Sequence, residues 1–339
     1  MEERLSTSKV EVFRIGKVED HPDADRLELV EAWGYVCVVK KGQFKEGDLA
    51  AYIPPETVLP NEEKWSFIWK GNAFPKDRQR RIKASRLRGI LSAGLIIEAP
   101  EGKVEGDDLW DEIGCTHYEP PISNKGMGGG EQKPITGPPV PNSTKTYDVE
   151  NGFRYHEAIE DGTQVLITEK IHGANARFLY YDGVMYAGSR KLWSSEGDNL
   201  WWRIVDKYPM IRTMCEHHEG WILYGEIYGC VQSLKYGHTQ DNPIDFAAFD
   251  VFNGNKYLDV EQKLQFFDEW DIPAVPIIDS IHYSFNDIGK YVSGPSMVNG
   301  ATHIREGIVV TPFIETYHRK VGRLQLKFVS NEYLEGKDQ

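Results

Sequence analysis

The stretch ITEKIHGANARF, residues 167–178, places a lysine where an apolar run ends and a glycine turn begins. Lys170 stands at that point, with His172 and Gly173 close behind it. Removing an ammonium group from water is costly, so a lysine at the end of a buried strand needs a reason. A lysine with its ordinary pKa of about 10.4 is uncharged in only about one molecule in 2,500 at pH 7. If Lys170 acts as a nucleophile, nearby cations are expected to lower its pKa.

Further polar residues occupy the ends of other apolar segments in the second half of the chain. One charged residue on a strand usually faces water, but six such positions on successive apolar strands predict a lined cleft. The six groups are Glu169-Lys170-x-His172-Gly173-x-Asn175, Ser189-Arg190-Lys191, Gly225-Glu226, Phe249-Asp250, Arg305-Glu306-Gly307 and Gln325-x-Lys327.

A nucleoside triphosphate suits such a cleft, because it is an electrophile that carries its own negative charge. A second lysine, Lys327, and a divalent metal ion held by Glu306 would lower the pKa of Lys170. Arg190, Lys327 and the metal ion would hold the phosphates and stabilise charge on the α-phosphate in the transition state.

Three other positions suit the nucleoside part of such a substrate. Phe249 would stack on the base, and Glu226 would bind a ribose hydroxyl. Gly173 has no side chain, so the backbone there is expected to approach a phosphate closely.

The six groups, in this order, resemble motifs I, Ia, III, IIIa, IV and V of the covalent nucleotidyltransferase superfamily, which contains ATP-dependent DNA and RNA ligases and mRNA capping enzymes. The resemblance covers residues 145–330 and implies that Lys170 attacks the α-phosphate of ATP, giving lysyl-AMP and pyrophosphate. DNA ligases and capping enzymes mostly carry Lys-x-Asp-Gly, whereas His172 is similar to RNA ligases of the nick-sealing type. An amino-terminal OB-like domain before this core resembles the layout of the Deinococcus-type RNA ligases, a branch also found in the amoeba Naegleria.

The resemblance implies three sets of site residues. The catalytic residues are Lys170, Lys327 and Glu306. The residues expected to bind ATP are Glu169, Ile171, His172, Asn175, Arg190, Glu226, Phe249 and Gln325. Glu306 and Glu226 are expected to bind Mg²⁺ or Mn²⁺, with two ions in the site.

Two features depart from the superfamily pattern. Capping enzymes and DNA ligases continue into a carboxy-terminal OB domain with motif VI, which orients the departing pyrophosphate, but only twelve residues follow Lys327 here. A second metal ion is expected to take over that task. In motif V, superfamily members often show Lys-x-Lys, whereas this chain reads Gln325-Leu326-Lys327, so Lys327 is expected to act alone.

The elements that must position these groups alternate between strands and helices. Runs rich in Val, Ile, Tyr and Phe predict strands, and apolar residues at helical spacing predict helices. Strands are predicted at 164–170, 176–181, 184–190, 221–229, 244–252, 305–313 and 322–329, and helices at 199–218 and 261–270. Hairpin turns such as Asp182-Gly183 make neighbouring strands antiparallel, so the fold class is α+β with an antiparallel-sheet nucleotidyltransferase domain over 144–339.

The first 113 residues have a different pattern. Short strands are predicted at 11–18, 27–33, 35–41, 48–54 and 89–99, with turn signals between them. Five such strands suit a small closed barrel, and an OB-like β-barrel that binds nucleic acid is the leading interpretation. HPDADRLELV and the strands after it resemble the tRNA-binding OB modules of some synthetases. Residues 114–143 hold six prolines and six glycines and are predicted to be a linker.

A basic cluster stands out in an acidic chain. The net charge is −13, yet residues 76–88 contain seven Lys or Arg and one Asp. Such a cluster predicts an anion-binding face that grips duplex phosphates, although a solvated charged strand or loop is the alternative. The residues expected to bind nucleic acid are Arg78, Arg80, Arg81, Lys83, Arg86 and Arg88.

The composition indicates in which cellular compartment the protein is expected. The sequence has 339 residues, no run of 18 apolar residues and no apolar segment at its start, so we expect an intracellular protein that does not cross a membrane. Four cysteines without C-x-x-C spacing favour a reducing compartment. We expect a monomeric ATP-dependent RNA ligase that acts on nicked duplex RNA or RNA–DNA. A DNA ligase, an mRNA guanylyltransferase and a non-catalytic tRNA- or RNA-binding protein are the alternatives.

Overall fold

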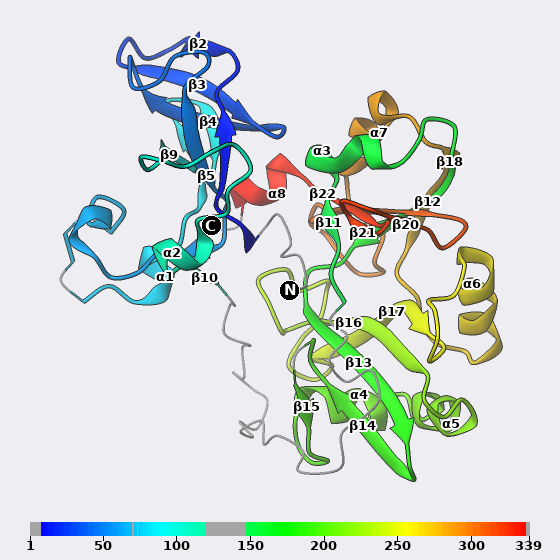
Figure 1. Ribbon diagram of the computed structural model, residues 1–339. Coiled ribbons are helices and arrows are strands. Elements are labelled where there is room, and N and C mark those ends of the chain that lie inside the picture. Colours follow the sequence, from blue (N-terminus) through cyan, green and yellow to red (C-terminus); the bar gives the residue numbers. More distant parts are fainter. Residues whose placement is uncertain (1–7, 70, 73, 119–146, 191, 337–339) are drawn as a thin grey trace. The chain divides into compact units, whose positions relative to one another are not determined.

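The computed structural model describes residues 8–69, 71–72, 74–118, 147–190 and 192–336 (Figure 1). These residues fall into two compact units. The first unit contains the described part of residues 1–120, together with Glu150–Arg154 and 334–336. The second contains residues 147–149 and 155–333. Of the predicted linker at 114–143, residues 119–143 lie outside the described residues, and residues 114–118 belong to the first unit.

The first unit is built mainly of short antiparallel strands. Its strands are β1 (Glu11–Arg14), β2 (Val18–Asp20), β3 (Leu27–Ala32), β4 (Tyr35–Lys40), β5 (Leu49–Ile53), β6 (Thr57–Val58), β7 (Ala84–Leu87), β8 (Ile90–Ala93), β9 (Leu95–Glu98) and β10 (Thr116–His117). Its short helices are a 3₁₀ turn at Glu63–Trp65, α1 (Asp77–Arg80) and α2 (Trp110–Ile113). The segment β11 (Glu150–Asn151) and the start of α3 (Gly152–Tyr155) also belong to it.

Strand β5 is the centre of the first unit. It pairs antiparallel with β1 on one edge and β9 on the other. Its residues alternate between two apolar clusters: Ala50 and Tyr52 enter one, and Ala51 and Ile53 enter the other. A strand buried on both faces reads as a continuous apolar run, which explains the sequence LAAYI.

The sheets of the first unit do not close into one hydrogen-bonded ring within the described residues. Their orders are β1-β5-β9, β2-β3-β4, β7-β8 and β10-β6. Gly94, with a φ of 106°, separates β8 from β9, and a β-carbon there would lie 2.5 Å from the Tyr52 ring. This bend sends β9 to the sheet of β5, while β8 stays with β7. The predicted OB-like fold is confirmed, but the closed barrel is not detected.

The second unit contains longer strands and most of the helices. Its strands are β12 (Gln164–Lys170), β13 (Ala174–Tyr181), β14 (Val184–Gly188), β15 (Trp193–Ser194), β16 (Ile222–Gly229), β17 (Ile244–Phe252), β18 (Ile277–His282), β19 (Gly307–Pro312), β20 (Tyr317–His318), β21 (Gly322–Arg323) and β22 (Leu326–Val329). Its helices are a 3₁₀ turn at His156–Ala158, α4 (Leu200–Lys207), α5 (Pro209–His217), α6 (Val260–Glu269) and α7 (Phe285–Val292); α8 (Asn331–Gly336) begins in it.

Two antiparallel sheets form the frame of this unit, as predicted. In one, β12 pairs with β18 and β19, and β19 pairs with β22. The other has the order β15-β14-β13-β16-β17. An isolated parallel bridge joins Ala248 to Ala274. Figure 1 shows α4 and α5 lying along the second sheet, where their apolar side chains join one large core cluster.

The single helix predicted at 199–218 is wrong in one respect. Tyr208 leaves the helical region with a ψ of 76°, and Pro209 starts a new helix at its first position. Proline disfavours a helical conformation in the residue before it and has no N–H to donate, so the chain breaks into α4 and α5. None of the described helices is long and apolar enough to cross a membrane.

Candidate active site

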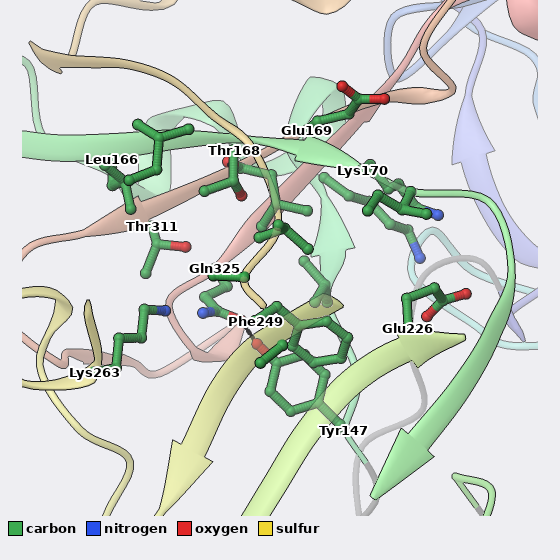
Figure 2. Close-up of a pocket in the computed structure, with 18 of the residues that line it drawn as sticks. Tyr147, Leu166, Thr168, Glu169, Lys170, Glu226, Phe249, Lys263, Thr311 and Gln325 are labelled. Carbon is green, nitrogen blue, oxygen red and sulfur yellow. Dashed lines mark hydrogen bonds between the residues drawn. The ribbon is translucent and has the colours of Figure 1, made fainter. Parts of the chain in front are cut away.

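A pocket of about 240 Å³ lies in the second unit, lined by residues of both sheets and of α6 (Figure 2). Two of the residues predicted from the sequence, His172 and Glu306, are not among those that line it. The predicted residues that do line it are Glu169, Lys170, Ile171, Asn175, Arg190, Glu226, Phe249, Gln325 and Lys327.

Lys170 ends β12 with its ammonium group paired to a carboxylate. Its Nζ lies 2.9 Å from Oε1 of Glu306. Lys170 stands opposite Gly307 in the β12–β19 ladder, and this register brings Glu306, the residue before Gly307, to the lysine. Burial would lower the pKa of Lys170, but the carboxylates of Glu306 and Glu226 outweigh burial and raise it. The charged neighbours named here are anions, so the predicted lowering of this pKa would have to come with the divalent metal ion.

Two glycines beside Lys170 let backbones approach closely. A β-carbon at Gly307 would lie 2.1 Å from the backbone oxygen of Phe328, and one at Gly173 would lie 2.1 Å from that of Ile227. Any other residue at these positions would push strands apart. The close approach at Gly173 in this structure is to the β16 backbone. A close approach to a phosphate there stays a prediction.

Glu226 faces Lys170 from the other sheet, where it stands opposite Asn175 on β13. Burial raises the pKa of Glu226 to about 8, with Glu306 adding to the rise and Lys170 opposing it. Glu226 therefore holds a proton more tightly than an exposed carboxyl does, and a divalent cation that binds there would displace that proton. No group of three or more His, Cys, Asp or Glu side chains forms a metal site within the part of the chain that the structure describes.

Two carboxylates are still a suitable donor set for the predicted ions. Mg²⁺ is usually bound by one or two carboxylates and takes its other ligands from substrate phosphates and water. Glu226 and Glu306 both act on the Lys170 ammonium, so a cation held by them would lie where phosphates must bind. Glu226 and Glu306 are therefore suitable ligands for the predicted Mg²⁺ or Mn²⁺ ions.

His172 turns toward a small polar network instead of the pocket. Its Nδ1 lies 3.0 Å from the Tyr333 hydroxyl and 3.5 Å from Oε2 of Glu306, and its Nε2 lies 3.2 Å from the Ser233 hydroxyl. Its backbone N–H donates to the Tyr236 hydroxyl at 2.7 Å. The structure therefore places His172 beside Glu306 in this network, and not among the residues that line the pocket.

The carboxylate of Glu169 points away from the pocket (Figure 2). It accepts hydrogen bonds from the Ser296 hydroxyl and the Met297 backbone N–H, both at 2.6 Å. Ile171 is buried in an apolar cluster with Tyr236. Glu169 therefore has no carboxylate oxygen directed at a nucleotide, and its polar contacts with one would come from its backbone.

Other predicted residues offer polar groups to the pocket. The side-chain oxygen of Asn175 is buried and has no hydrogen-bond partner among the described residues. An orphaned acceptor in a pocket wall is expected to receive a donor from a ligand. Arg190 Nη1 lies 2.8 Å from Oδ1 of Asp148, and its side chain is half-buried. Lys327 lines the pocket from β22, opposite Val309.

A β-bulge turns Phe249 toward the pocket. Ala248 and Asp250 pair with consecutive residues of β16, so Phe249 is an extra residue in β17. Bulges re-aim side chains in this way. The Phe249 ring lies 4.7 Å from the ring of Tyr147, and Figure 2 shows both rings in the middle of the pocket. They offer the aromatic surface that a stacked base requires.

Asp250 is fully buried and pairs with two cations that the sequence did not single out. Its Oδ2 lies 2.7 Å from Arg323 Nη1, and its Oδ1 lies 3.6 Å from Lys263 Nζ. Burial raises the pKa of Asp250, but these two cations prevail and lower it. The Tyr147 hydroxyl and the Gln325 amide donate to Oδ2 at 2.6 and 3.2 Å. Asp250 thus fixes the Tyr147 ring that packs on Phe249.

This network explains why a neutral residue is tolerated in motif V. Gln325 is buried, and its Oε1 lies 2.5 Å from the Tyr147 hydroxyl and 3.4 Å from Arg323 Nη1. A lysine at position 325 would add a third cation beside Arg323 and Lys263, with Asp250 between them. Gln325 supports the pocket wall as an uncharged member of that network.

Several residues of the basic cluster in the first unit form ion pairs within the protein. Arg81 pairs with Glu56 at 3.4 Å, Arg80 pairs with Asp77 at 2.5 Å, and Arg86 contacts both carboxylate oxygens of Glu335 at 2.7 Å. The exposed members of the cluster are Lys76, Arg78, Lys83, Arg86 and Arg88. Arg80 and Arg81, which are half-buried, therefore hold the fold, and a nucleic acid would meet the exposed members.

Residues 163–329 match the family model for RNA ligase, and residues 9–99 match a model for an OB-fold domain. The second unit belongs to the RNA ligase family. The match begins just before β12 and ends with β22, so the RNA ligase unit contains all nine pocket residues named above. RNA ligases act on RNA, and use of ATP with Mg²⁺ or Mn²⁺ agrees with the pocket described here.

Solved structures of an RNA ligase from Naegleria gruberi share the fold of the whole chain. One mutant of that protein, with ATP and Mn, has a TM-score of 0.82 at 24% sequence identity and covers 97% of this chain and 99% of its own. The structure with PPi has a TM-score of 0.81 at 24% identity, with coverage of 98% and 99%. At these identities the likeness shows the fold, and this chain is a distinct protein from the Naegleria enzyme. No curated protein matches the chain.

Proposed function

We propose that this RNA ligase acts as a monomer and seals nicks with 3′-hydroxyl and 5′-phosphate ends in duplex RNA or RNA–DNA, using ATP and Mg²⁺ or Mn²⁺. The observation that carries the proposal is Lys170 at one end of a pocket whose middle presents the Phe249 ring. A nucleotide whose base stacks on Phe249 would bring its α-phosphate toward the lysine amine. One chain supplies every residue of this pocket.

The reaction has three steps. The Lys170 amine bonds to the α-phosphorus of ATP and pyrophosphate leaves, which gives lysyl-AMP. The 5′-phosphate of the nick then attacks the AMP phosphorus and frees the amine. Finally the 3′-hydroxyl attacks the activated 5′-phosphate, forms the phosphodiester bond and expels AMP.

The first step requires an uncharged amine, although Glu306 and Glu226 hold the pKa of Lys170 high. A divalent cation bound by these two carboxylates would cancel their charge and polarise the phosphates. Lys327 and Arg190 add positive charge along the same pocket and would hold the phosphates of ATP. Lys170 is therefore expected to lose its proton only when the divalent cation is bound.

Labelling with α-labelled ATP or GTP and a denaturing gel tests this proposal. We expect label to stay on the protein with ATP, to require Mg²⁺ or Mn²⁺, and to be discharged by a nicked RNA duplex. Label from GTP and not ATP would identify a guanylyltransferase. Sealing restricted to DNA nicks would identify a DNA ligase. No label with either nucleotide would favour an RNA-binding protein without catalysis.

The exposed cluster residues Arg78 and Arg88 are proposed to grip duplex phosphates. Replacing both with alanine is expected to weaken binding of a nicked RNA duplex and to reduce the slope of log affinity against log salt by about 1 to 2. Lysyl-AMP formation should stay unchanged, because the pocket lies in the other unit. Fluorescence anisotropy at several salt concentrations measures both quantities.

A matched control is Lys17→Ala with Lys41→Ala, which removes two exposed cations of the same unit outside residues 76–88. This control is expected to change the salt slope much less. Equal losses in the two double variants would mean that general charge, and not the cluster, binds the duplex.

We also propose that the protein works in a reducing intracellular compartment. All four cysteines, Cys37, Cys115, Cys215 and Cys230, are free thiols.

A further inference from the structure

Lys263 is a buried cation in the pocket wall that none of the three steps above uses. It lies on α6, the residue is only 5% exposed, and it lines the pocket. Its ammonium group has three hydrogen-bond donors and no acceptor. Oδ1 of Asp250 lies 3.6 Å away, which is beyond hydrogen-bond distance. A contact of this length leaves the ammonium with donors for a ligand.

The position of Lys263 in the pocket wall is not explained by a role as counter-ion of Asp250. Asp250 is already bonded at 2.7 Å by Arg323, which also contacts Glu315 at 2.6 and 2.9 Å. Charge balance over these four groups explains why the Lys263 ammonium is tolerated inside the protein. It does not explain why the ammonium faces a pocket, since a buried cation is costly where an apolar side chain would pack.

Lys263 lies at the opposite end of the pocket from the reacting amine. Figure 2 shows Lys263 and Thr311 on one side, Lys170 and Glu226 on the other, and the Phe249 ring between them. A nucleotide with its α-phosphate at Lys170 and its base on Phe249 would therefore direct the outer edge of the base toward Lys263.

The strand register sets the length of this path. Thr311 pairs with Leu166 and Gly307 pairs with Lys170, so the two ends of the pocket are four residues apart along β12. At about 3.3 Å per residue this separation is about 13 Å, enough for a phosphate, a ribose and a base in sequence.

The far end of the pocket is otherwise suited to a flat apolar ring. Leu166 lines it from β12, and Phe267 lines it from the same face of α6 as Lys263, four residues further along. In such surroundings the Lys263 ammonium and the Thr311 hydroxyl supply fixed polar contacts, and such contacts determine orientation in an apolar pocket.

We propose that Lys263, together with Thr311, reads the edge of the ATP base. The ammonium only donates, so it requires a ring nitrogen of adenine as acceptor. The Thr311 hydroxyl accepts as well as donates, so it suits the exocyclic amino group beside that nitrogen. This assignment rests on the proposed function, because it places the α-phosphate at Lys170.

Adenine analogues that lack one ring nitrogen test the assignment. Lysyl-AMP formation is measured with ATP and with 1-deaza-, 3-deaza- and 7-deaza-ATP, in the wild-type protein and in Lys263→Met. The wild type is expected to lose about 10-fold in kcat/KM with either 1-deaza- or 7-deaza-ATP, and to use 3-deaza-ATP like ATP, because N3 does not lie beside the amino group. Lys263→Met should lose a similar factor with ATP, mainly through KM, and should lose nothing further with that analogue.

Two more variants make the result specific. Lys256→Met removes an exposed lysine that lies seven residues before Lys263 in the sequence. This variant should match the wild type with every nucleotide. Lys263→Arg keeps a donor and should retain part of the discrimination. Thermal unfolding shows whether Lys263→Met is folded; if it is not, the analogue series in the wild type decides.

The inference is overturned if no analogue costs the wild type more than about 2-fold, or if the same analogue costs Lys263→Met as much as the wild type. In either case label from ATP would still support the ligase proposal. Absence of label from ATP in the wild type would instead remove the ligase proposal, so the two failures are distinguishable.

Discussion

Replacing Lys170 with methionine is expected to abolish the lysyl-AMP label and to lower sealing of 5′-phosphate nicks by about 10⁴-fold or more. Methionine has a similar length and fills the same space, but it has no amine to bond to phosphorus. The loss should appear as a fall in kcat at saturating ATP, because the pocket that binds ATP is otherwise intact. Gel assays of protein labelling and of nick sealing measure the two effects.

Pre-adenylylated nicks separate this chemical role from a structural one. The last step needs no lysine nucleophile, so Lys170→Met should still seal a nick whose 5′ end already carries AMP. Lys256→Met, at an exposed lysine, is the matched control and should retain full activity. If Lys170→Met joins non-activated ends at the wild-type rate, Lys170 is not the nucleophile.

Replacing Glu306 with glutamine has the second-largest expected effect, a fall of about 10²-fold or more in the rate of lysyl-AMP formation. Two consequences of this change oppose each other. Loss of the carboxylate 2.9 Å from Nζ lowers the pKa of Lys170, which favours the uncharged amine. The same loss removes a ligand for the divalent cation that the triphosphate requires. We expect the second consequence to prevail.

The pH profile of Glu306→Gln shows both consequences. Its labelling rate should reach a plateau at a lower pH than in the wild type, because the Lys170 pKa falls, while the plateau itself is lower. Higher Mn²⁺ concentrations should recover part of the loss. A variant that labels as fast as the wild type at pH 7, or faster, would show that Glu306 serves only as a counter-ion.

Local patterns predicted the main elements and most of the pocket. Lys170 ends β12 as predicted, whereas Glu226 and Phe249 lie inside the apolar strands β16 and β17. Nine predicted residues line one pocket, because antiparallel strands of fixed register hold residues from distant parts of the chain side by side. The Pro209 break between α4 and α5 was also readable in the sequence, since proline disfavours a continuous helix there.

Other features depended on contacts between residues far apart in the chain. In the sequence EQKLQFF, Lys263 reads as a solvated residue of an amphipathic helix, and only the packing of α6 beside β17 buries it next to Asp250. The bulge at Phe249 has no signal in IDFAAFDVF, because it results from a change of pairing register with β16. Likewise, the Tyr333 and Glu306 contacts of His172 join segments more than 130 residues away.

From its residue order alone, this chain specifies an OB-like unit, an antiparallel α+β unit and a lysine at the end of a strand, since propensity, periodicity and motif spacing act over a few residues. The protonation of that lysine, the aim of Phe249 and the burial of Lys263 are set by the folded protein. They depend on electrostatic and packing interactions between strands and helices that come together only on folding, and such distances cannot be read from neighbouring residues.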